Sequence, residues 1–310
     1  MTDLPVVLMM GGHSAEREVS LRSGAAVKQA LMNLGHDVEV VEDIKALKQW
    51  SPDSVSLVFN ILHGADGEDG RLAAWLEAEG YRSTCVNFTA ACVSWHKDLA
   101  KRVVTAAGLL TPESQLLKTP SDLNVTGTGP WIVKPATEGS SVGLFKAEDQ
   151  RSLKQHIVAA FEVCDEVLVE DFITGAECTV GVVGDTVLPV VEIVPADGLY
   201  DYHAKYQSQQ TAYHCPARMP AAWQQALQKD ALAACEAINI RGWCRVDFIV
   251  DETGRRWFLE VNTTPGMTAA SLLPKAAAAQ GWEFDQLVEA IINTADNISA
   301  NGVNQGGEHE

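Results

Sequence analysis

Two segments near the end of the chain concentrate residues that could do chemistry. One carries Arg245 and Asp247, and the other carries Glu260, Asn262 and Gly266. Asp247, Glu260 and Asn262 offer carboxylate and amide oxygens, and such oxygen ligands select a hard cation. Mg²⁺ characteristically shares ligands of this kind with nucleotide phosphates. Together with the guanidinium of Arg245, the pattern predicts a site for magnesium and a polyphosphate.

An antiparallel hairpin would bring these two segments together. Apolar runs at 246–250 and 257–261 flank the turn formers of 251–254. This arrangement is typical of two strands joined by a four-residue turn.

The register of that hairpin decides where its polar side chains point. If Val250 pairs with Arg255 across the turn, Arg245 lies opposite Glu260. Strand alternation then turns the polar residues of both segments to one face. A slip of one residue would remove that common face. The alternative is an ordinary hairpin whose charged residues form an outer face.

A loop after another predicted strand could hold phosphate. Lys134 ends the strand 131–134 and is followed by the small residues of 135–143, whose backbone amides could wrap a phosphate chain. The loop is not a Walker A sequence, which has Gly-Lys-Ser/Thr opening a helix. Lys97 and Lys205 could add positive charge. A flexible connection and solvated lysines are the alternative.

Glycine-rich turns follow two strands in the first part of the chain. After the first strand, Ser14 is the predicted N-cap of a helix over 15–34, with Glu16 in its first turn. Glu16 could complement the helix dipole or bind the ammonium of a ligand. The turn that starts at His63 contains glycines that let a ligand approach the backbone, although it could also be simply a tight turn.

A further candidate site follows the hairpin. Residues 264–270 carry exposed amides into a helix predicted to begin near Ser271. A carboxylate could be held there by the Ser271 hydroxyl and backbone N–H groups. An ordinary loop with a serine cap is the alternative.

The first part of the chain alternates strand and helix, which predicts a parallel sheet with helices on both faces. Ligands of such sheets collect beyond the carboxyl ends of the strands, where both glycine-rich turns lie. The expected strands are 6–10, 38–41 and 56–62.

Short strands dominate the remainder of the chain. A two-residue hairpin turn is expected at 184–185, and residues 195–215 read as an irregular functional loop. The polar, glycine-rich segment after Asp296 is expected to be a frayed tail. The other expected elements are strands 131–134, 144–146, 167–170, 177–183 and 186–194, and helices 95–107 and 221–237.

Length and composition limit the class of protein. With 310 residues and 46% hydrophobic content, the chain can form two or three domains. Its net charge of -18 argues against nucleic acid or an anionic membrane as a partner. No apolar run could span a bilayer and the first residues lack a signal-peptide pattern, so a cytoplasmic protein is expected. Seven scattered cysteines without CxxC spacing predict reduced thiols.

These motifs together resemble one family over essentially the whole chain, the D-alanine:D-alanine ligases, which are ATP-grasp carboxylate-amine ligases. The resemblance implies a mixed α/β and α+β architecture with an N-terminal Rossmann-like parallel-sheet domain, a small central domain and a C-terminal domain with an antiparallel sheet. The implied divisions are 1–88, 89–175 and 176–295, with a disordered tail over 296–310. The segments that carry the resemblance occur in family order: 11–20, 62–64, 67–70, 134–143, 200–206, 245–247 and 260–268.

The resemblance also implies an ATP site between the central and C-terminal domains. Two Mg²⁺ ions, or Mn²⁺ in their place, would be held by Asp247, Glu260 and Asn262. The implied ATP residues are Lys97, Lys134 and Lys205 at the phosphates, Glu177 at the ribose, Glu170 near the adenine, and Ile173.

In the implied reaction, ATP phosphorylates the carboxylate of one D-alanine and the amine of a second D-alanine attacks the acyl phosphate. The product is the dipeptide, with ADP and phosphate. The implied roles are Glu16 on the first ammonium, Arg245 and the Gly266 amide on the oxyanion, Ser271 and the Leu272 amide on the second carboxylate, His63 lining the second alanine site, and Ser140 and Tyr206 linked to Glu16 to close the site.

Two other functions compete with this one. Tyr206 resembles the dipeptide-forming members and favours an amine as second substrate, but D-lactate or D-serine is the alternative within the same class. A nucleotide-binding regulator that has lost catalysis is the alternative from another class. The family resemblance also implies a homodimer.

Overall fold

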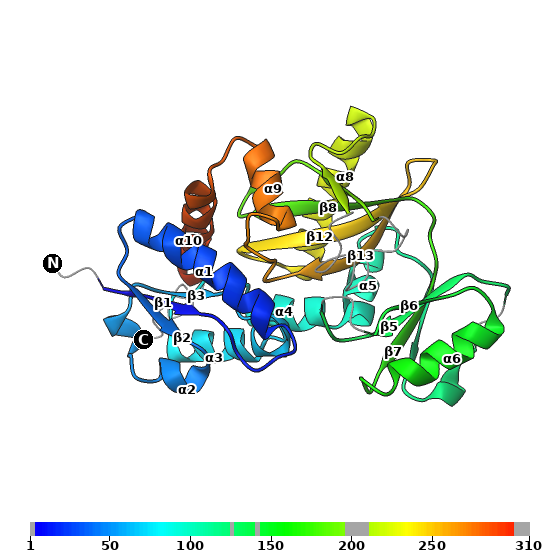
Figure 1. Ribbon diagram of the computed structural model, residues 1–310, viewed down its shortest axis with the longest axis horizontal. Coiled ribbons are helices and arrows are strands. Elements are labelled where there is room, and N and C mark those ends of the chain that lie inside the picture. The colour runs from blue at the N-terminus through cyan, green and yellow to red at the C-terminus, as the bar shows by residue number, and fades with distance from the viewer. Residues whose placement is uncertain (1–3, 125–126, 140–142, 196–210, 301–310) are drawn as a thin grey trace, which may run out of the picture.

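The computed structural model describes residues 4–124, 127–139, 143–195 and 211–300. Figure 1 shows a small parallel sheet at one end of the molecule, a second sheet at the other end, and a third sheet between and above them. This arrangement confirms the expected mixture of one parallel sheet with antiparallel sheets. No helix in the described part of the chain is both long and apolar enough to cross a membrane.

The first sheet is parallel, as expected, with strand order β2-β1-β3. Its strands are short, and all four residues of β1 and of β3 are buried, whereas β2 at the edge is largely exposed. The elements of this region are β1 (Val6–Met9), α1 (Arg17–Asn33), β2 (Val38–Val41), α2 (Ile44–Leu47), the 3-10 helix Pro52–Ser54, β3 (Leu57–Asn60), the 3-10 helix Gly64–Asp66 and α3 (Arg71–Glu79).

The start of α1 differs from the expectation. Its N-cap is Glu16, so the prediction of Ser14 as the cap is wrong. The Ser14 hydroxyl donates instead to the carbonyl oxygen of His63 at 2.7 Å and accepts from the Glu16 amide. Ser14 therefore joins the two glycine-rich turns, and Glu16 stands at the entry of the helix.

The second sheet is antiparallel, in the order β4-β7-β5-β6. Helix α6 packs against β5 and β6, and Leu153 and Ile157 of this helix share a core with Trp131. The elements are β4 (Ser114–Leu117), the 3-10 helix Pro120–Asp122, β5 (Trp131–Pro135), β6 (Phe145–Ala147), α6 (Gln150–Ala160) and β7 (Val167–Asp171).

Two helices connect the first and second sheets. These are α4 (Phe88–Trp95) and α5 (Lys97–Ala106), where one helix over 95–107 was expected. Both pack against strand β13 and helix α8 of the third sheet region. Buried Ala90, Ala100 and Val104 belong to the core of that region. The domain divisions at 88 and 175 stay a prediction.

The third sheet has the strand order β11-β10-β8-β12-β13, with β9 paired to β8. The turn of Gly184 and Asp185 is confirmed, because Val183 pairs with Thr186. A single strand over 186–194 is wrong, since Pro189 has no amide hydrogen for a ladder and separates two strands. The strands are β8 (Ala176–Val183), β9 (Thr186–Val187), β10 (Val191–Val194), β11 (Ala212–His214), β12 (Trp243–Val250) and β13 (Arg256–Asn262).

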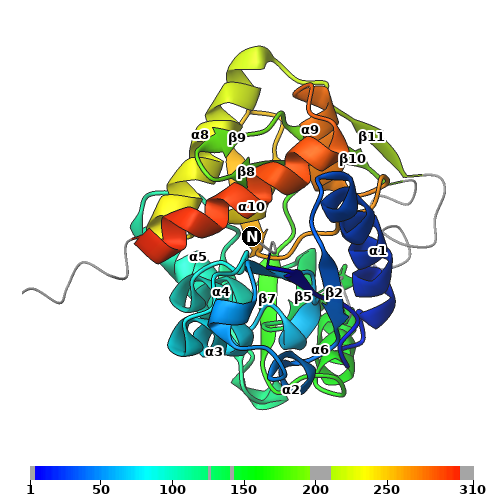
Figure 2. The same ribbon diagram turned by 90° about the vertical axis from the view of Figure 1, so that its left-hand side faces the viewer.

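Within the described residues, the third region also contains the helices α8 (Ala221–Ile238), α9 (Leu272–Ala279) and α10 (Phe284–Ala300). Helix α10 packs against α1 and β8, so the last helix returns to the first domain (Figure 2). Its buried residues Leu287 and Ile291 share a core with Leu31 of α1. Helix α10 ends at Ala300, whereas a tail was expected after Asp296, and the tail itself stays a prediction.

The β12–β13 hairpin has a register different from the expected one. Val250 pairs with Arg256, not Arg255, and Arg245 lies opposite Asn262, not Glu260. The turn is one residue longer than expected, and a β-bulge at Leu259 adds one more residue between the pairs. The two differences total two residues, so the alternation of faces is preserved.

Candidate active site

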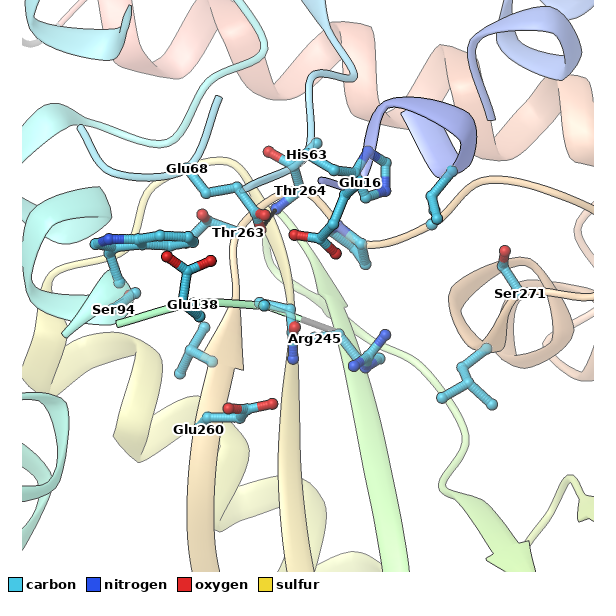
Figure 3. A pocket seen from close by; sticks show the side chains of 18 of the residues that line it. Glu16, His63, Glu68, Ser94, Glu138, Arg245, Glu260, Thr263, Thr264 and Ser271 are labelled. Atoms are coloured by element: carbon cyan, nitrogen blue, oxygen red, sulfur yellow. Dashed lines mark hydrogen bonds between the residues drawn. The ribbon is translucent and has the colours of Figure 1, made fainter. Parts of the chain in front are cut away.

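Two cavities beside the β12–β13 hairpin are lined by Glu260. The first, here called the Glu16 cavity, has a volume of 340 Å³ and lies between the loops of the first domain and the third sheet. In Figure 3, Glu16 and His63 lie on one side of this cavity, and Arg245 and Glu260 rise from strands on the other. It is lined by all the described residues expected at the amino acid substrates: Glu16, His63, Arg245, Gly266, Ser271 and Leu272.

The second, here called the Glu170 cavity, has a volume of 110 Å³ and lies between the second and third sheets. It is lined by all the described residues expected at ATP: Lys97, Lys134, Glu170, Ile173 and Glu177. The remaining expected residues, Ser140, Lys205 and Tyr206, lie outside the described part of the chain.

The three expected metal ligands lie where the cavities adjoin. Asp247 lines the Glu170 cavity, Asn262 lines the Glu16 cavity, and Glu260 lines both. In the observed register Asp247 is directly opposite Glu260. Lys97 also lines both cavities, and its Nζ lies 3.6 Å from Glu260 Oε2 and donates to the Glu138 carbonyl oxygen at 2.5 Å.

Asp247 is buried and accepts hydrogen bonds from three sides. Arg245 donates from Nε to Oδ1 at 2.9 Å and from Nη2 to Oδ2 at 2.8 Å. The Asn262 amide nitrogen donates to Oδ2 at 2.9 Å, and the Thr179 hydroxyl donates to Oδ1 at 2.5 Å. Sequence reasoning missed Thr179, because only the pairing of β8 with β12 places it opposite Asp247.

Glu170 is buried between two lysines. Its Oε1 accepts from Lys101 Nζ at 2.7 Å, and its Oε2 lies 2.9 Å from Lys134 Nζ. Burial acts to raise the pKa of Glu170, but the positive charges of Lys134 and Lys101 outweigh burial and lower it. The carboxylate is therefore held ionised beside the Glu170 cavity. Lys101 was not among the expected site residues.

His63 offers an acceptor to the Glu16 cavity. Burial lowers the pKa of its imidazole, which favours the neutral ring. Its Nδ1 lies 2.9 Å from the carbonyl oxygen of Ile61, and a carbonyl can only accept, so Nδ1 carries the hydrogen. The buried Nε2 has no hydrogen-bond partner within the described residues. It is therefore free to accept a hydrogen bond from an amine.

Glu68 is a second buried carboxyl in this cavity that sequence reasoning left without a role. It accepts hydrogen bonds from the amide of Gly64 at 2.8 Å and from the amide of Thr264 at 3.3 Å. Burial, followed by the nearby charge of Glu16, raises its pKa to about 8. Glu68 thereby connects a turn of the first domain to the loop that follows the hairpin.

The loop after the hairpin is fixed from both sides. The amide of Met267 donates to Ser23 Oγ of α1 at 3.1 Å, and the amide of Thr268 donates to Ser271 Oγ at 3.0 Å. A Cβ on Gly266 would lie 2.9 Å from Ser271 Oγ, so a larger residue there would displace the Ser271 hydroxyl. The contacts fix the path of the backbone that carries the Gly266 amide.

Gly139 brings the loop after β5 against Glu16. A Cβ at this position would lie 2.5 Å from Glu16 Oε2. The second-sheet loop therefore reaches the carboxylate at the start of α1, which places the two cavities in one continuous site.

Two antiparallel sheets with the Glu170 cavity between them, joined to a parallel-sheet domain, are the architecture of an ATP-grasp fold. The protein-family model described as "D-ala D-ala ligase C-terminus" matches residues 109–293 of this chain. A D-alanine–D-alanine ligase of Syntrophotalea carbinolica is 42% identical over 93% of this chain and 94% of its own length. One of Haemophilus ducreyi is 40% identical over 93% of this chain and 96% of its own length.

Solved structures agree with the sequence matches. A D-alanine–D-alanine ligase from Bacillus anthracis, complexed with ATP, matches with a TM-score of 0.83 and 27% identity, over 96% of this chain and 99% of its own. The VanG D-Ala:D-Ser ligase from Enterococcus faecalis matches with a TM-score of 0.83 and 27% identity, over 95% of this chain and 100% of its own. The chain belongs to the D-alanine–D-alanine ligase family.

Proposed function

We propose that this protein joins two D-alanine molecules into D-alanyl-D-alanine, with conversion of ATP to ADP and phosphate, for the synthesis of peptidoglycan precursors. The observation that carries this proposal is the pair of adjoining cavities, one lined by the ATP residues and one by the amino acid residues, with Glu260 and Lys97 common to both. A phosphate transferred from one cavity to a carboxylate in the other would cross only their common border.

The charges of the Glu16 cavity suit the proposed substrates. Glu16 offers a carboxylate to the ammonium of the first D-alanine, and Arg245 offers a guanidinium opposite it. When the second amine attacks the acyl phosphate, the carbonyl oxygen gains negative charge. Arg245 and the Gly266 amide would stabilise that oxyanion, an effect worth a large share of catalysis in such sites.

The second D-alanine would lie between His63 and the start of α9. Ser271 and the Leu272 amide would hold its carboxylate at the helix N-terminus, where backbone N–H groups favour an anion. The free Nε2 of His63 would accept a hydrogen bond from the attacking amine. Closure of the site by Ser140 and Tyr206 remains a proposal from the family resemblance.

In the Glu170 cavity, Lys97 and Lys134 would bind the phosphates of ATP, Glu177 the ribose, and Glu170 the adenine, with Ile173 beside it. The third phosphate-binding lysine, Lys205, rests on the family resemblance alone.

The residues at the border of the cavities fit Mg²⁺, with Mn²⁺ as a substitute. Asp247, Glu260 and Asn262 supply only oxygen ligands, the choice of a hard cation. Asp247 and Glu260 are cross-strand neighbours, so their carboxylates can act together. When bound there, two ions would neutralise the charge of the transferring phosphate. Lys97 and Arg245 lie at the same border and contribute positive charge from the protein in addition to that of the ions.

A ligase that uses D-serine as second substrate is the competing activity, because the VanG D-Ala:D-Ser ligase has the same TM-score as the D-alanine–D-alanine ligase. D-lactate would be a further variant. Membership in an enzyme family removes the support for a regulator without catalysis. We further propose a homodimer in the cytoplasm, with no nucleic acid or membrane as a partner.

Phosphate release from ATP and Mg²⁺ tests the proposal. The assay uses D-alanine, L-alanine, and D-alanine with D-serine or D-lactate, with products identified by mass. Release with D-alanine alone and formation of the dipeptide support the proposed function. Release only with a second acceptor would reassign the substrate, and no release under any condition would contradict the activity.

A further inference from the structure

Lys101 contacts Glu170 but does not line the Glu170 cavity. It belongs to α5 and is 2% exposed, and its Nζ lies 2.7 Å from Glu170 Oε1. Glu170 is also 2% exposed. Lys134 and Glu170 both line the Glu170 cavity, whereas Lys101 does not. One carboxylate thus has one lysine inside the cavity and another behind it.

The two lysines cannot be equivalent once ATP is bound. Lys134 would then turn toward phosphate oxygens, which compete with Glu170 for the Lys134 ammonium. A buried carboxylate that loses its only partner is strongly destabilised, or takes up a proton. Lys101 does not line the cavity, so its contact with Glu170 would persist when the cavity is occupied.

We propose that Lys101 is a positioning residue that keeps Glu170 ionised and oriented when Lys134 binds the nucleotide phosphates. The inference rests on the proposed function, because it assumes that the Glu170 cavity binds ATP. Its content is separate: Lys101 touches no substrate and acts only through Glu170. Without Lys101, Lys134 would stay paired with Glu170. Its ammonium would then not be available to the phosphates of ATP, and ATP would bind more weakly.

The test measures ATP binding and steady-state kinetics of the full chain with Lys101→Met. The KM for ATP and the dissociation constant for ATP without D-alanine should both rise on the order of 10-fold, the scale of a lost hydrogen bond to a charged group. The KM values for D-alanine should stay within about twofold, since the Glu16 cavity is unchanged. Arg102→Met is the matched control, because Arg102 lies on the same helix and pairs with Asp98 at an exposed position.

A second comparison separates a positioning role from general damage to the fold. In a Glu170→Gln background no carboxylate needs a partner, so adding Lys101→Met should change the KM for ATP by less than about twofold. In this double variant Lys134 no longer faces a buried carboxylate. The comparison with Glu170→Gln alone can therefore be made even if Lys101→Met alone does not fold. An equal rise in KM with and without the Glu170 carboxylate would overturn the proposal, as would a single variant with unchanged ATP binding.

Failure of the proposed function would be visible separately. ATP binding measured without D-alanine does not depend on the second substrate. The role of Lys101 can therefore be tested even if the wild-type enzyme forms another product. A wild-type chain that binds no ATP would contradict both.

Discussion

Arg245 and Asp247, which are two residues apart on β12, are joined by two hydrogen bonds of 2.9 and 2.8 Å. The first is the proposed oxyanion donor and the second the proposed metal ligand. Because side chains two residues apart on a strand share a face, a single strand presents both to the border of the cavities. The carboxylate orients the guanidinium, so the two roles depend on each other.

Arg245→Ala should lower kcat for dipeptide formation on the order of 100-fold or more, because it removes the oxyanion donor. The KM for ATP should change far less, since the nucleotide residues lie in the other cavity. Arg255→Ala is a suitable control, because Arg255 makes a similar ion pair with Asp251 of the same hairpin but lies outside both cavities. Unchanged turnover in the Arg245 variant would remove this residue from the mechanism.

Asp247→Asn should raise the Mg²⁺ concentration required for half-maximal activity by about 10-fold or more, because one of two ligand charges is lost. Titration of activity with Mg²⁺ at saturating ATP measures this shift. Asp251→Asn provides the comparison: Asp251 accepts from Thr253 and Trp257 at the hairpin turn, so its loss should lower the melting temperature and leave the Mg²⁺ requirement unchanged. Equal Mg²⁺ titrations for the Asp247 variant and the wild type would contradict the assignment.

Glu16→Gln should raise the KM for the first D-alanine about 10-fold, because an ionic hydrogen bond to the ammonium becomes a neutral one. The two Michaelis constants for D-alanine are obtained from the dependence of the rate on its concentration. Glu18→Gln, an exposed position in the first turn of the same helix, should leave both constants unchanged. An effect confined to the KM for ATP would be inconsistent with the proposed contact.

Glu68→Gln should change how stability depends on pH. The pKa of Glu68 is raised from 4.5 to about 8, so between these values the folded chain binds the proton more tightly than the unfolded chain. The stability that Glu68 contributes is full at low pH and is lost as pH rises to about 8.

Melting temperatures measured across pH test this expectation. The wild type should lose stability relative to the Gln variant from about pH 5 to pH 8, with a constant difference at lower pH. Glu79→Gln, an exposed substitution on α3, should show no such trend. A wild-type to Glu68→Gln difference that does not vary with pH would show that Glu68 has an ordinary pKa.

Local sequence was sufficient for the elements with strong patterns. The apolar strands before the two glycine-rich turns predicted the parallel sheet, and Gly184 and Asp185 predicted their hairpin turn. The start of α1 was predicted less accurately. Ser14 has the sequence of a helix cap, but the N-cap of α1 is Glu16. The Ser14 hydroxyl accepts from the Glu16 amide and donates to the carbonyl oxygen of His63 in the other glycine-rich turn, a contact that local sequence does not show.

The shared face of the metal residues was predicted for a reason that was only partly right. The expected pairing of Arg245 with Glu260 is wrong, yet the extra turn residue and the bulge at Leu259 restore the same alternation. A sequence pattern shows the period of a strand but not where a bulge adds a residue, because the bulge depends on how the partner strand pairs.

The sequence by itself determined which residue types are available for the chemistry: oxygen ligands for a hard cation, lysines for phosphate, and a guanidinium for an oxyanion. Only the tertiary structure decided the groups that support them. Lys101 meets Glu170 across two elements far apart in the chain, and Glu68 meets the amide of Thr264 in another domain. Burial and the charged neighbours that packing supplies together set the charge state of such groups. Both are properties of the whole packed fold that no local spacing records.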